Sequence, residues 1–187
     1  MTTNLWVEQL SKNTLKYLTS LARKKYRDRH GVFLAEGPKL ITDLHGAGME
    51  LQQLYTTDTE AFKGLEAEQI SAVELKKISN QRSPNTAFAV FSKKQSTPLK
   101  QTGLILALDG LQDPGNLGTI IRLSDWFGVS DVVCSKDTAD CYNPKVVQAS
   151  MGALARVQLH YFEDLSQWLK ECSLVVYGGF MQGDDVY

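Results

Sequence analysis

The chain has 187 residues, of which 43% are hydrophobic, enough for the cores of one large domain or two small ones. It contains no run of eighteen apolar residues and does not begin like a secretory signal, so we expect a cytoplasmic protein without a membrane span. Its three cysteines lack CxxC spacing and its three histidines are scattered, which argues against structural disulfides and against a metal site.

The formal net charge of −1 conceals an asymmetry between the two halves of the chain. Residues 1–100 hold 15 Lys and Arg against 10 Asp and Glu, whereas residues 101–187 hold 5 against 11. Most of the basic excess lies in a cluster that includes one acid, Asp28, and these seven cations: Lys12, Lys16, Arg23, Lys24, Lys25, Arg27 and Arg29. Such a cluster attracts phosphate backbones, although a solvated helix face would show the same pattern.

The first half of the chain alternates between helical and strand patterns. Apolar spacing predicts helices over residues 13–25, from Pro38 through Leu44, and over Glu74–Ile78. It predicts short strands over four further stretches: Val32–Ala35, Leu51–Thr56, Ile70–Val73 and Ala87–Phe91. This alternation indicates a small α/β domain over residues 1–97, which ends in the polar linker Ser92–Gly103.

The second half alternates more clearly. Strands are predicted at Leu104–Leu108, Asp131–Cys134, Val157–Tyr161 and Leu174–Tyr177, separated by helices over 117–127, from Pro144, and over Glu163–Glu171. We therefore expect residues 98–187 to form a parallel sheet with right-handed crossovers, and the apolar run Leu104–Leu108 to be buried on both faces.

The loop after that first strand is the candidate site. A strand end, a glycine-bearing loop and a helix N-terminus form the place where open α/β sheets bind ligands. Asn116 is predicted to cap the following helix, with one face carrying Gly118, Arg122 and Asp125. The opposite, apolar face would carry the inward side chains: Ile120, Ile121, Leu123, Trp126 and Phe127. On periodicity alone, Arg122 is a surface arginine paired with Asp125.

Two familiar nucleotide sites fit this loop badly. A dinucleotide-binding site needs GxGxxG, whereas Gly110, Gly115 and Gly118 are not spaced as GxG. A Walker loop would need a Lys followed by Ser or Thr after the glycines, and none is present.

The run from Asp113 to Arg122, DPGNLGTIIR, with Trp126-Phe-Gly128 after it, resembles the first motif of the SpoU (TrmH-like) RNA ribose methyltransferases. These enzymes belong to the SPOUT superfamily of α/β-knot proteins. The segment Pro144–Ala153 is similar to the helix after the second strand of that family. The segment Phe33–Gly37, with the helix after it, is similar to the family's substrate-binding domain, which resembles some ribosomal RNA-binding proteins.

The resemblance implies transfer of a methyl group from S-adenosylmethionine to a ribose 2′-hydroxyl of structured ribosomal or transfer RNA, by a homodimer. It makes Asn116 and Arg122 the functional positions of the motif, and it adds Ser150 to the residues expected to contact RNA. Because arginine stays protonated in proteins, we expect Arg122 to hold a phosphate and align the hydroxyl rather than to act as the base. Asn116 would orient Arg122 or the ribose.

The family's second and third motifs, which bind most of the methyl donor and form much of the dimer interface, are not found before Tyr187. We therefore expect the chain to be a fragment, with the donor-binding residues lying beyond Tyr187 and part of the sheet exposed. The alternative is an RNA-binding module that does not catalyse. A dinucleotide-binding reductase is a weaker third possibility.

Overall fold

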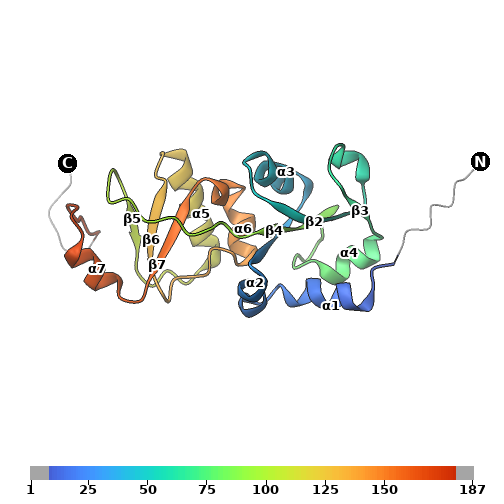
Figure 1. Cartoon of the computed structure of the whole chain (residues 1–187), viewed down its shortest axis with the longest axis horizontal. Helices are drawn as coiled ribbons and strands as arrows, with labels where there is room; N and C mark the ends of the chain where they lie inside the picture. The colour runs from blue at the N-terminus through green and yellow to red at the C-terminus, as the bar shows by residue number, and fades with distance from the viewer. Residues whose placement is uncertain (1–8, 180–187) are drawn as a thin grey trace, which may run out of the picture.

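The computed structural model describes residues 9–179, which form two sheets side by side along the long axis of the molecule (Figure 1). Within these residues, no helix is long and apolar enough to cross a membrane. The mixed α/β architecture expected from the sequence is confirmed.

The first sheet has four strands in the order β1-β4-β2-β3. Strand β4 (Ala87–Ser92) pairs antiparallel with β1 (Val32–Glu36) and with β2 (Leu51–Thr56), while β2 pairs parallel with the short β3 (Glu68–Gln69). Its helices are α1 (Lys12–Ser20), α2 (Lys24–His30), α3 (Pro38–Gly46), the 3₁₀ turn η1 (Thr59–Phe62) and α4 (Ala72–Ile78).

Two sequence predictions fail in this part. The single helix over 13–25 is two helices, because the chain turns between α1 and α2 with Leu21 buried at the turn. The strand over Ile70–Val73 is absent, because Ser71 and Glu74 form a capping box that starts α4 there. In that box the Ser71 hydroxyl accepts from the Glu74 N–H at 3.2 Å, and the Glu74 carboxylate accepts from the Ser71 N–H at 3.0 Å.

The first sheet has apolar side chains on both faces. One face packs under α1 and α4, where the buried residues include Leu18, Leu75 and Phe88. The other face shares a core with the second sheet, and Phe33 lies between Phe91 and Tyr142 with ring centroids 5.6 and 5.1 Å apart. The two sheets are therefore joined by a common apolar core.

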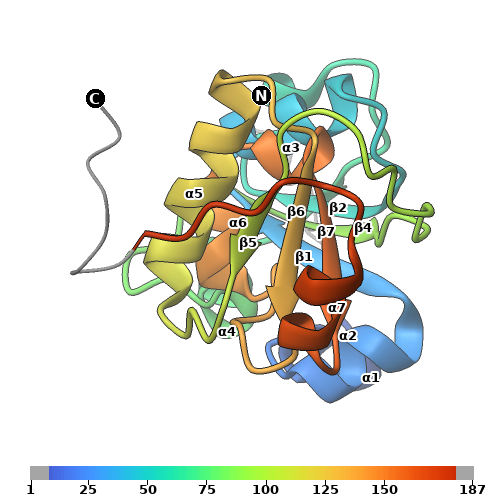
Figure 2. The same ribbon diagram turned by 90° about the vertical axis from the view of Figure 1, so that its left-hand side faces the viewer.

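The second sheet is parallel, with the order β5-β6-β7. Its elements are β5 (Leu106–Leu108), α5 (Pro114–Trp126), β6 (Asp131–Ser135), α6 (Pro144–Ser150), the 3₁₀ turn η2 (Ala153–Ala155), β7 (Gln158–Phe162) and α7 (Leu165–Glu171). Figure 2 shows α5 and α6 on one side of this sheet and α7 on the other.

Two predictions for this sheet are wrong. Residues 174–177 form no strand, so the sheet has three strands among the described residues rather than four. Strand β5 is therefore an edge strand and not one buried on both faces, and Leu104 just before it is 69% exposed.

The linker predicted between Ser92 and Gly103 has neither helix nor strand beyond Ser92. Its first residues are held by both parts of the molecule. The Lys93 N–H donates to the Gly31 carbonyl at 2.8 Å, and the Lys94 N–H donates to the Tyr142 hydroxyl at 3.1 Å. The linker thus begins in the junction between the two sheets.

Candidate functional site

Helix α5 begins at Pro114, and its N-cap is Asp113 rather than Asn116. The Asp113 carboxylate accepts a hydrogen bond from the Asn116 N–H at 2.7 Å. The prediction for Asn116 was wrong because proline is favoured in the first turn of a helix, which shifts the cap to the residue before it. The Asn116 side chain is exposed.

Helix α5 packs against α6 through Gly118. A Cβ atom at this position would lie 2.5 Å from the Ala149 Cβ and 2.8 Å from the Val146 carbonyl oxygen. Gly118 is accordingly buried, and the helix face that it was predicted to share with Arg122 is covered here by α6. The absent side chain is what lets the two helices approach, and it fixes where Arg122 emerges one turn later.

The side chain of Arg122 is exposed and points toward the end of α6. Its Nη1 lies 2.9 Å from the Met151 sulfur. Met151 has φ 50° and ψ 42°, a left-handed conformation that is costly for a residue with a side chain and that accumulates at functional sites. Six residues apart on one helix, Asn116 and Arg122 project about 120° apart, and no hydrogen bond joins them in the described structure.

Asp125 pairs with Arg156 and not with Arg122. The Arg156 Nε and Nη2 donate to the two Asp125 carboxylate oxygens at 2.8 and 2.6 Å. Hydrogen bonding from Arg156 lowers the pKa of Asp125 below its ordinary value. Because this carboxylate is already engaged, Arg122 has no carboxylate partner among the described residues and is available to an anion.

A cavity of about 520 Å³ opens beside Arg122, between the two sheets. One wall comes from the first part of the chain and includes Gly37, Lys39 and Asn85. The opposite wall includes Gln148 and Met151 of the α6 end. Sequence analysis missed Lys39, Asn85 and Gln148, because they lie far apart in the chain and no short-range pattern connects them.

The wall that contains Asn85 is held by a buried carboxylate. Glu36, 6% exposed, accepts hydrogen bonds from the Ser79 hydroxyl, from the Asn80 N–H at 2.8 Å and from the Asn80 side chain at 3.2 Å. A Cβ atom on Gly37, which has φ 95°, would lie 3.0 Å from the Asn85 Nδ2. The loop over residues 79–86 is therefore fixed against the end of β1.

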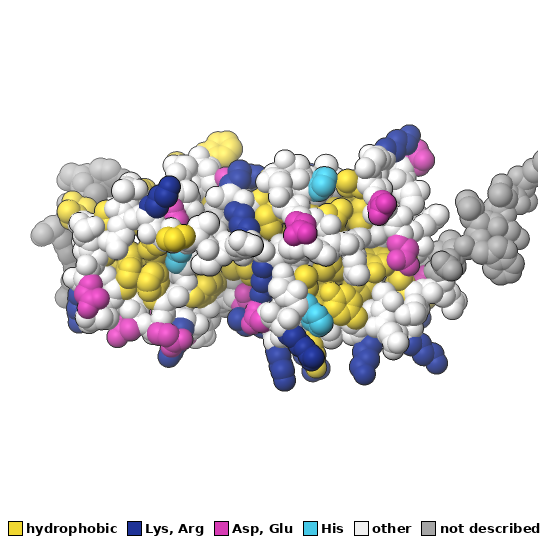
Figure 3. Space-filling view, viewed as in Figure 1, with side chains coloured by type: hydrophobic (Ala, Val, Ile, Leu, Met, Phe, Trp, Pro, Cys, Tyr) yellow, Lys and Arg dark blue, Asp and Glu magenta, His cyan; other side chains and the backbone are white. Residues whose placement is uncertain are grey.

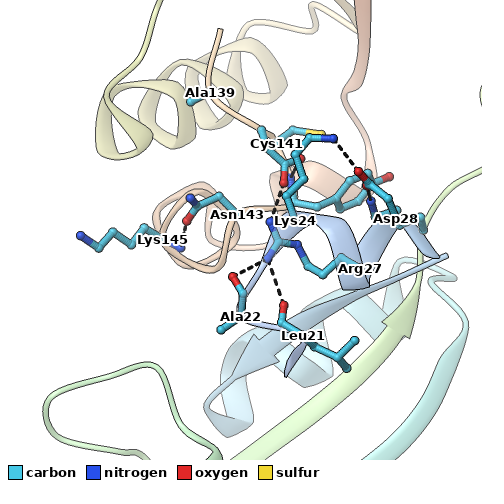
Figure 4. A network of polar contacts seen from close by, with 12 residues as sticks. Leu21, Ala22, Lys24, Arg27, Asp28, Ala139, Cys141, Asn143 and Lys145 are labelled. Atoms are coloured by element: carbon cyan, nitrogen blue, oxygen red, sulfur yellow. Dashed lines mark hydrogen bonds and ion pairs between the residues drawn. The ribbon is translucent and has the colours of Figure 1, made fainter. Parts of the chain in front are cut away.

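The predicted basic cluster lies on and between α1 and α2 and is called here the α1–α2 cluster. Most of it lies on the surface, but Arg27 does not. Its side chain is 2% exposed, donates to the carbonyls of Leu21 and Ala22 at 3.0 and 2.7 Å (Figure 4), and pairs with Asp140 at 2.6 Å. Arg27 was wrongly assigned to an RNA-binding surface, because a guanidinium with these partners joins α2 to the second part of the molecule. The other members are exposed: Lys12, Lys16, Arg23, Lys24, Lys25 and Arg29.

Ser150 is also misplaced in the predicted RNA-contacting set. Its side chain is fully buried and its hydroxyl donates to the Val147 carbonyl at 2.9 Å within α6. This bond satisfies the hydroxyl internally, as serine often does near a helix end.

The predicted apolar face of α5 is only partly inward. Ile121 is buried, whereas Leu123, Trp126 and Phe127 are 47%, 83% and 74% exposed. The last turn of α5 therefore presents an apolar patch, called here the α5 patch and defined by these three exposed residues.

Comparison with known proteins matches this arrangement along most of the chain. Residues 103–186 match the model of the SpoU rRNA Methylase family, and residues 12–89 match that of the MRM3-like substrate binding domain. A mitochondrial rRNA methyltransferase 3 of Xenopus laevis is 34% identical over 164 residues, which are 79% of this chain and 39% of the relative. The chain thus spans about two fifths of the length of that relative.

A bacterial relative is covered more fully. The 23S rRNA (guanosine(2553)-2'-O)-methyltransferase RlmP of Bacillus subtilis is 28% identical over 191 residues, which cover 97% of this chain and 75% of the relative.

Solved structures of RNA methyltransferases have a similar fold. A TrmH-family protein from Porphyromonas gingivalis superposes with a TM-score of 0.84 at 37% identity, covering 94% of this chain and 73% of that one. An AdoMet-bound rRNA methyltransferase from Sinorhizobium meliloti gives a TM-score of 0.73 at 27% identity, with coverage of 89% and 68%. The chain belongs to the SpoU (TrmH) family of RNA methyltransferases.

Proposed function

We propose that the protein carrying this sequence transfers a methyl group from S-adenosylmethionine to a ribose 2′-hydroxyl of ribosomal RNA. The observation that carries the proposal is Arg122, which lines a cavity between the two sheets and forms no ion pair with a carboxylate among the described residues. The names of the Xenopus and Bacillus relatives support rRNA as the substrate class, and the AdoMet-bound Sinorhizobium structure supports the donor.

Arg122 acts as a binding group. A guanidinium stays protonated in proteins, so it does not accept the proton that the ribose hydroxyl loses when its oxygen bonds to the methyl carbon and the sulfur–methyl bond of the donor breaks. It can bind the adjacent phosphate through two parallel N–H donors and hold the hydroxyl in line for transfer. The proton leaves to water.

The cavity beside Arg122 does not suit the donor itself. Six of its ten lining residues are polar or charged and none is aromatic, whereas sites for ligands such as adenosine are lined predominantly by hydrophobic and aromatic side chains. We therefore assign no described residue to donor binding, and this cavity belongs to the RNA.

Asn116 is exposed and makes no side-chain hydrogen bond within the described residues. We assign it to the RNA rather than to the orientation of Arg122. In the same proposal, residues 1–97 bind RNA and residues 98–187 belong to the methyltransferase domain.

The test is transfer of tritiated methyl from S-adenosylmethionine to rRNA. Replacing Arg122 with Ala should reduce turnover by about 10²-fold or more, because positioning of the reacting groups is lost. Arg122→Lys should recover part of it, since a point charge replaces a bidentate donor. Lys170→Ala, which removes an exposed cation on α7, is the matched control.

Near-normal turnover of Arg122→Ala would remove Arg122 from the site. Failure of the unsubstituted protein to methylate, with RNA binding retained, would favour the RNA-binding module instead.

The proposal includes a homodimer in the cytoplasm. The α5 patch supports the dimer, because an apolar surface of this kind is stabilised by burial against a partner. Light scattering of Trp126→Glu should show monomers where the unsubstituted protein shows dimers, and unchanged mass would place the interface elsewhere.

A further inference from the structure

The cavity beside Arg122 is one section of a longer groove. A second cavity of about 420 Å³, lined by Arg82 and Lys145, shares Glu36 and Gln148 with it. A third of about 560 Å³, lined by Arg156, shares Met151 with it and also Asp43. Because neighbouring cavities share their walls, they form one continuous depression between the two sheets, called here the junction groove.

A fourth cavity of about 360 Å³, lined by Lys24, Lys93 and Lys94, is separate, because it shares no lining residue with the three cavities of the junction groove. In Figure 3, Lys and Arg side chains gather in a band at the middle of the molecule, between two regions rich in apolar atoms.

The cations of the junction groove divide into two kinds. Some are neutralised by carboxylates: Lys39 by Asp43 at 2.8 Å and Arg156 by Asp125 at 2.6 Å. Three others have no carboxylate partner among the described residues: Arg82, Arg122 and Lys145. Arg82 comes from residues 1–97, and Arg122 and Lys145 come from the methyltransferase part.

The rim that carries Arg82 is held in place before any ligand arrives. The buried Glu36 network fixes the start of the loop over 79–86, as described above. From the same loop the Gln81 Nε2 donates to the Gln148 Oε1 of α6 at 3.1 Å. This bond ties the loop to α6, so Arg82 is presented by a supported loop and little ordering is needed on binding.

Given the proposed function, we propose that the junction groove is the track of a single-stranded RNA segment that passes Arg122, and that it provides more of the RNA affinity than the α1–α2 cluster. Phosphates would balance three cations that have no carboxylate partner among the described residues. The groove runs from the Glu36 end of β1 along α3 to Arg156, and a single strand can follow such a path where a stiff duplex cannot.

The experiment measures fluorescence anisotropy of a fluorescein-labelled, single-stranded RNA of mixed sequence over a salt series, beside the same RNA as a duplex. The groove variant Arg82→Ala/Lys145→Ala leaves Arg122 intact. The comparison variant Lys12→Ala/Lys16→Ala removes the same charge from the α1–α2 cluster.

We expect the groove variant to lower affinity for the single strand by about fivefold or more, and to reduce the slope of log Kd against log salt by about 1.4, or ~0.7 for each lost phosphate contact. The comparison variant should change both quantities less. Equal losses in the two variants, or tighter binding of the duplex, would overturn the inference. All four substituted side chains are exposed, and circular dichroism checks that both variants fold.

Methylation assays on the same proteins separate this inference from the proposed function. Loss of RNA binding in the groove variant, when the unsubstituted protein shows no methyl transfer, would uphold the groove and reject the function. Methyl transfer with an unchanged KM for RNA in the groove variant would uphold the proposed function and reject the groove as the RNA track.

Discussion

The α1–α2 cluster and the junction groove are both rich in Lys and Arg, but they use their cations differently. In the cluster, Arg27 is buried against Asp140, and Asp28 binds Lys24 at 2.7 Å and Lys93 at 2.5 Å. In the groove, Arg82, Arg122 and Lys145 line the cavities and form no ion pair with a carboxylate in residues 9–179. Cations paired with carboxylates join parts of the protein, whereas unpaired cations grouped in a depression are available to a ligand.

The Arg27–Asp140 contact shows the first kind of use most clearly. Arg27 satisfies two carbonyls and a carboxylate, yet its Nε is buried with no hydrogen-bond partner in the described structure. A buried arginine with one unsatisfied donor is costly, so its benefit lies in fixing α2 against the segment before α6.

The largest effect is expected for Arg27→Met, which keeps the apolar stem and removes the charge. Breaking a buried pair from one side costs about 3 kcal/mol of unfolding free energy, since Asp140 keeps its charge with the partner gone. Urea unfolding measures it, and Arg29→Met, at an exposed neighbour, should change stability by less than about 0.5 kcal/mol. A folded, equally stable Arg27→Met protein that binds RNA more weakly would return Arg27 to the RNA surface.

The next largest effect is expected at Gly118, where α5 packs closely against α6. Gly118→Ala should lower the unfolding free energy by about 2 kcal/mol, because its Cβ would overlap the Ala149 Cβ and the Val146 carbonyl, and α6 must shift. Calorimetric unfolding measures the change. Thr119→Ala on the exposed side of α5 is the control, and Gly118→Ala/Ala149→Gly should recover part of the loss by removing one of the two overlaps. Full stability of Gly118→Ala would mean that the helices are not held at this distance.

Local patterns predicted the elements that depend on neighbouring residues. The strand at Leu51–Thr56, the helix starts at Pro38 and Pro144 and the parallel second sheet follow from apolar spacing and from proline at the first helical position. The motif over residues 113–122 located α5 and Arg122 for the same reason, since its residues are contiguous.

Features set by distant parts of the chain could not be predicted. Helical periodicity placed Gly118 and Arg122 on one face of α5, but it could not show that α6 covers Gly118 while Trp126 stays 83% exposed, because the position of α6 decides what α5 buries. Charge density along the chain likewise counted Arg27 as a surface cation, although its partner Asp140 lies 113 residues away. The groove residues Lys39 and Asn85 gave no signal at all.

The smallest effect concerns the carboxylate at the groove rim. Asp125→Asn removes the bidentate partner of Arg156, a pair in which Asp125 is 24% and Arg156 is 51% exposed, so about 0.5 kcal/mol of stability should be lost at neutral pH. Because hydrogen bonding from Arg156 lowers the pKa of Asp125 below its ordinary 3.8, the pair stabilises the fold above about pH 4 and loses its effect as pH falls below 3.8. Unfolding free energies measured from pH 7 to pH 3 should therefore converge for the two proteins at the acid end. A difference that stays constant with pH would mean that the carboxylate charge is not the cause.

Asp125→Asn also changes the number of unpaired cations in the junction groove. It changes Arg156 from a paired cation to an unpaired one within the junction groove, without altering the α1–α2 cluster. If unpaired cations are what the groove offers to RNA, the Asp125→Asn protein should bind the single strand more tightly at low salt, and its slope of log Kd against log salt should steepen by up to about 0.7. An unchanged slope would show that Arg156 lies outside the path of the strand, which would shorten the track to the section between Arg82 and Arg122.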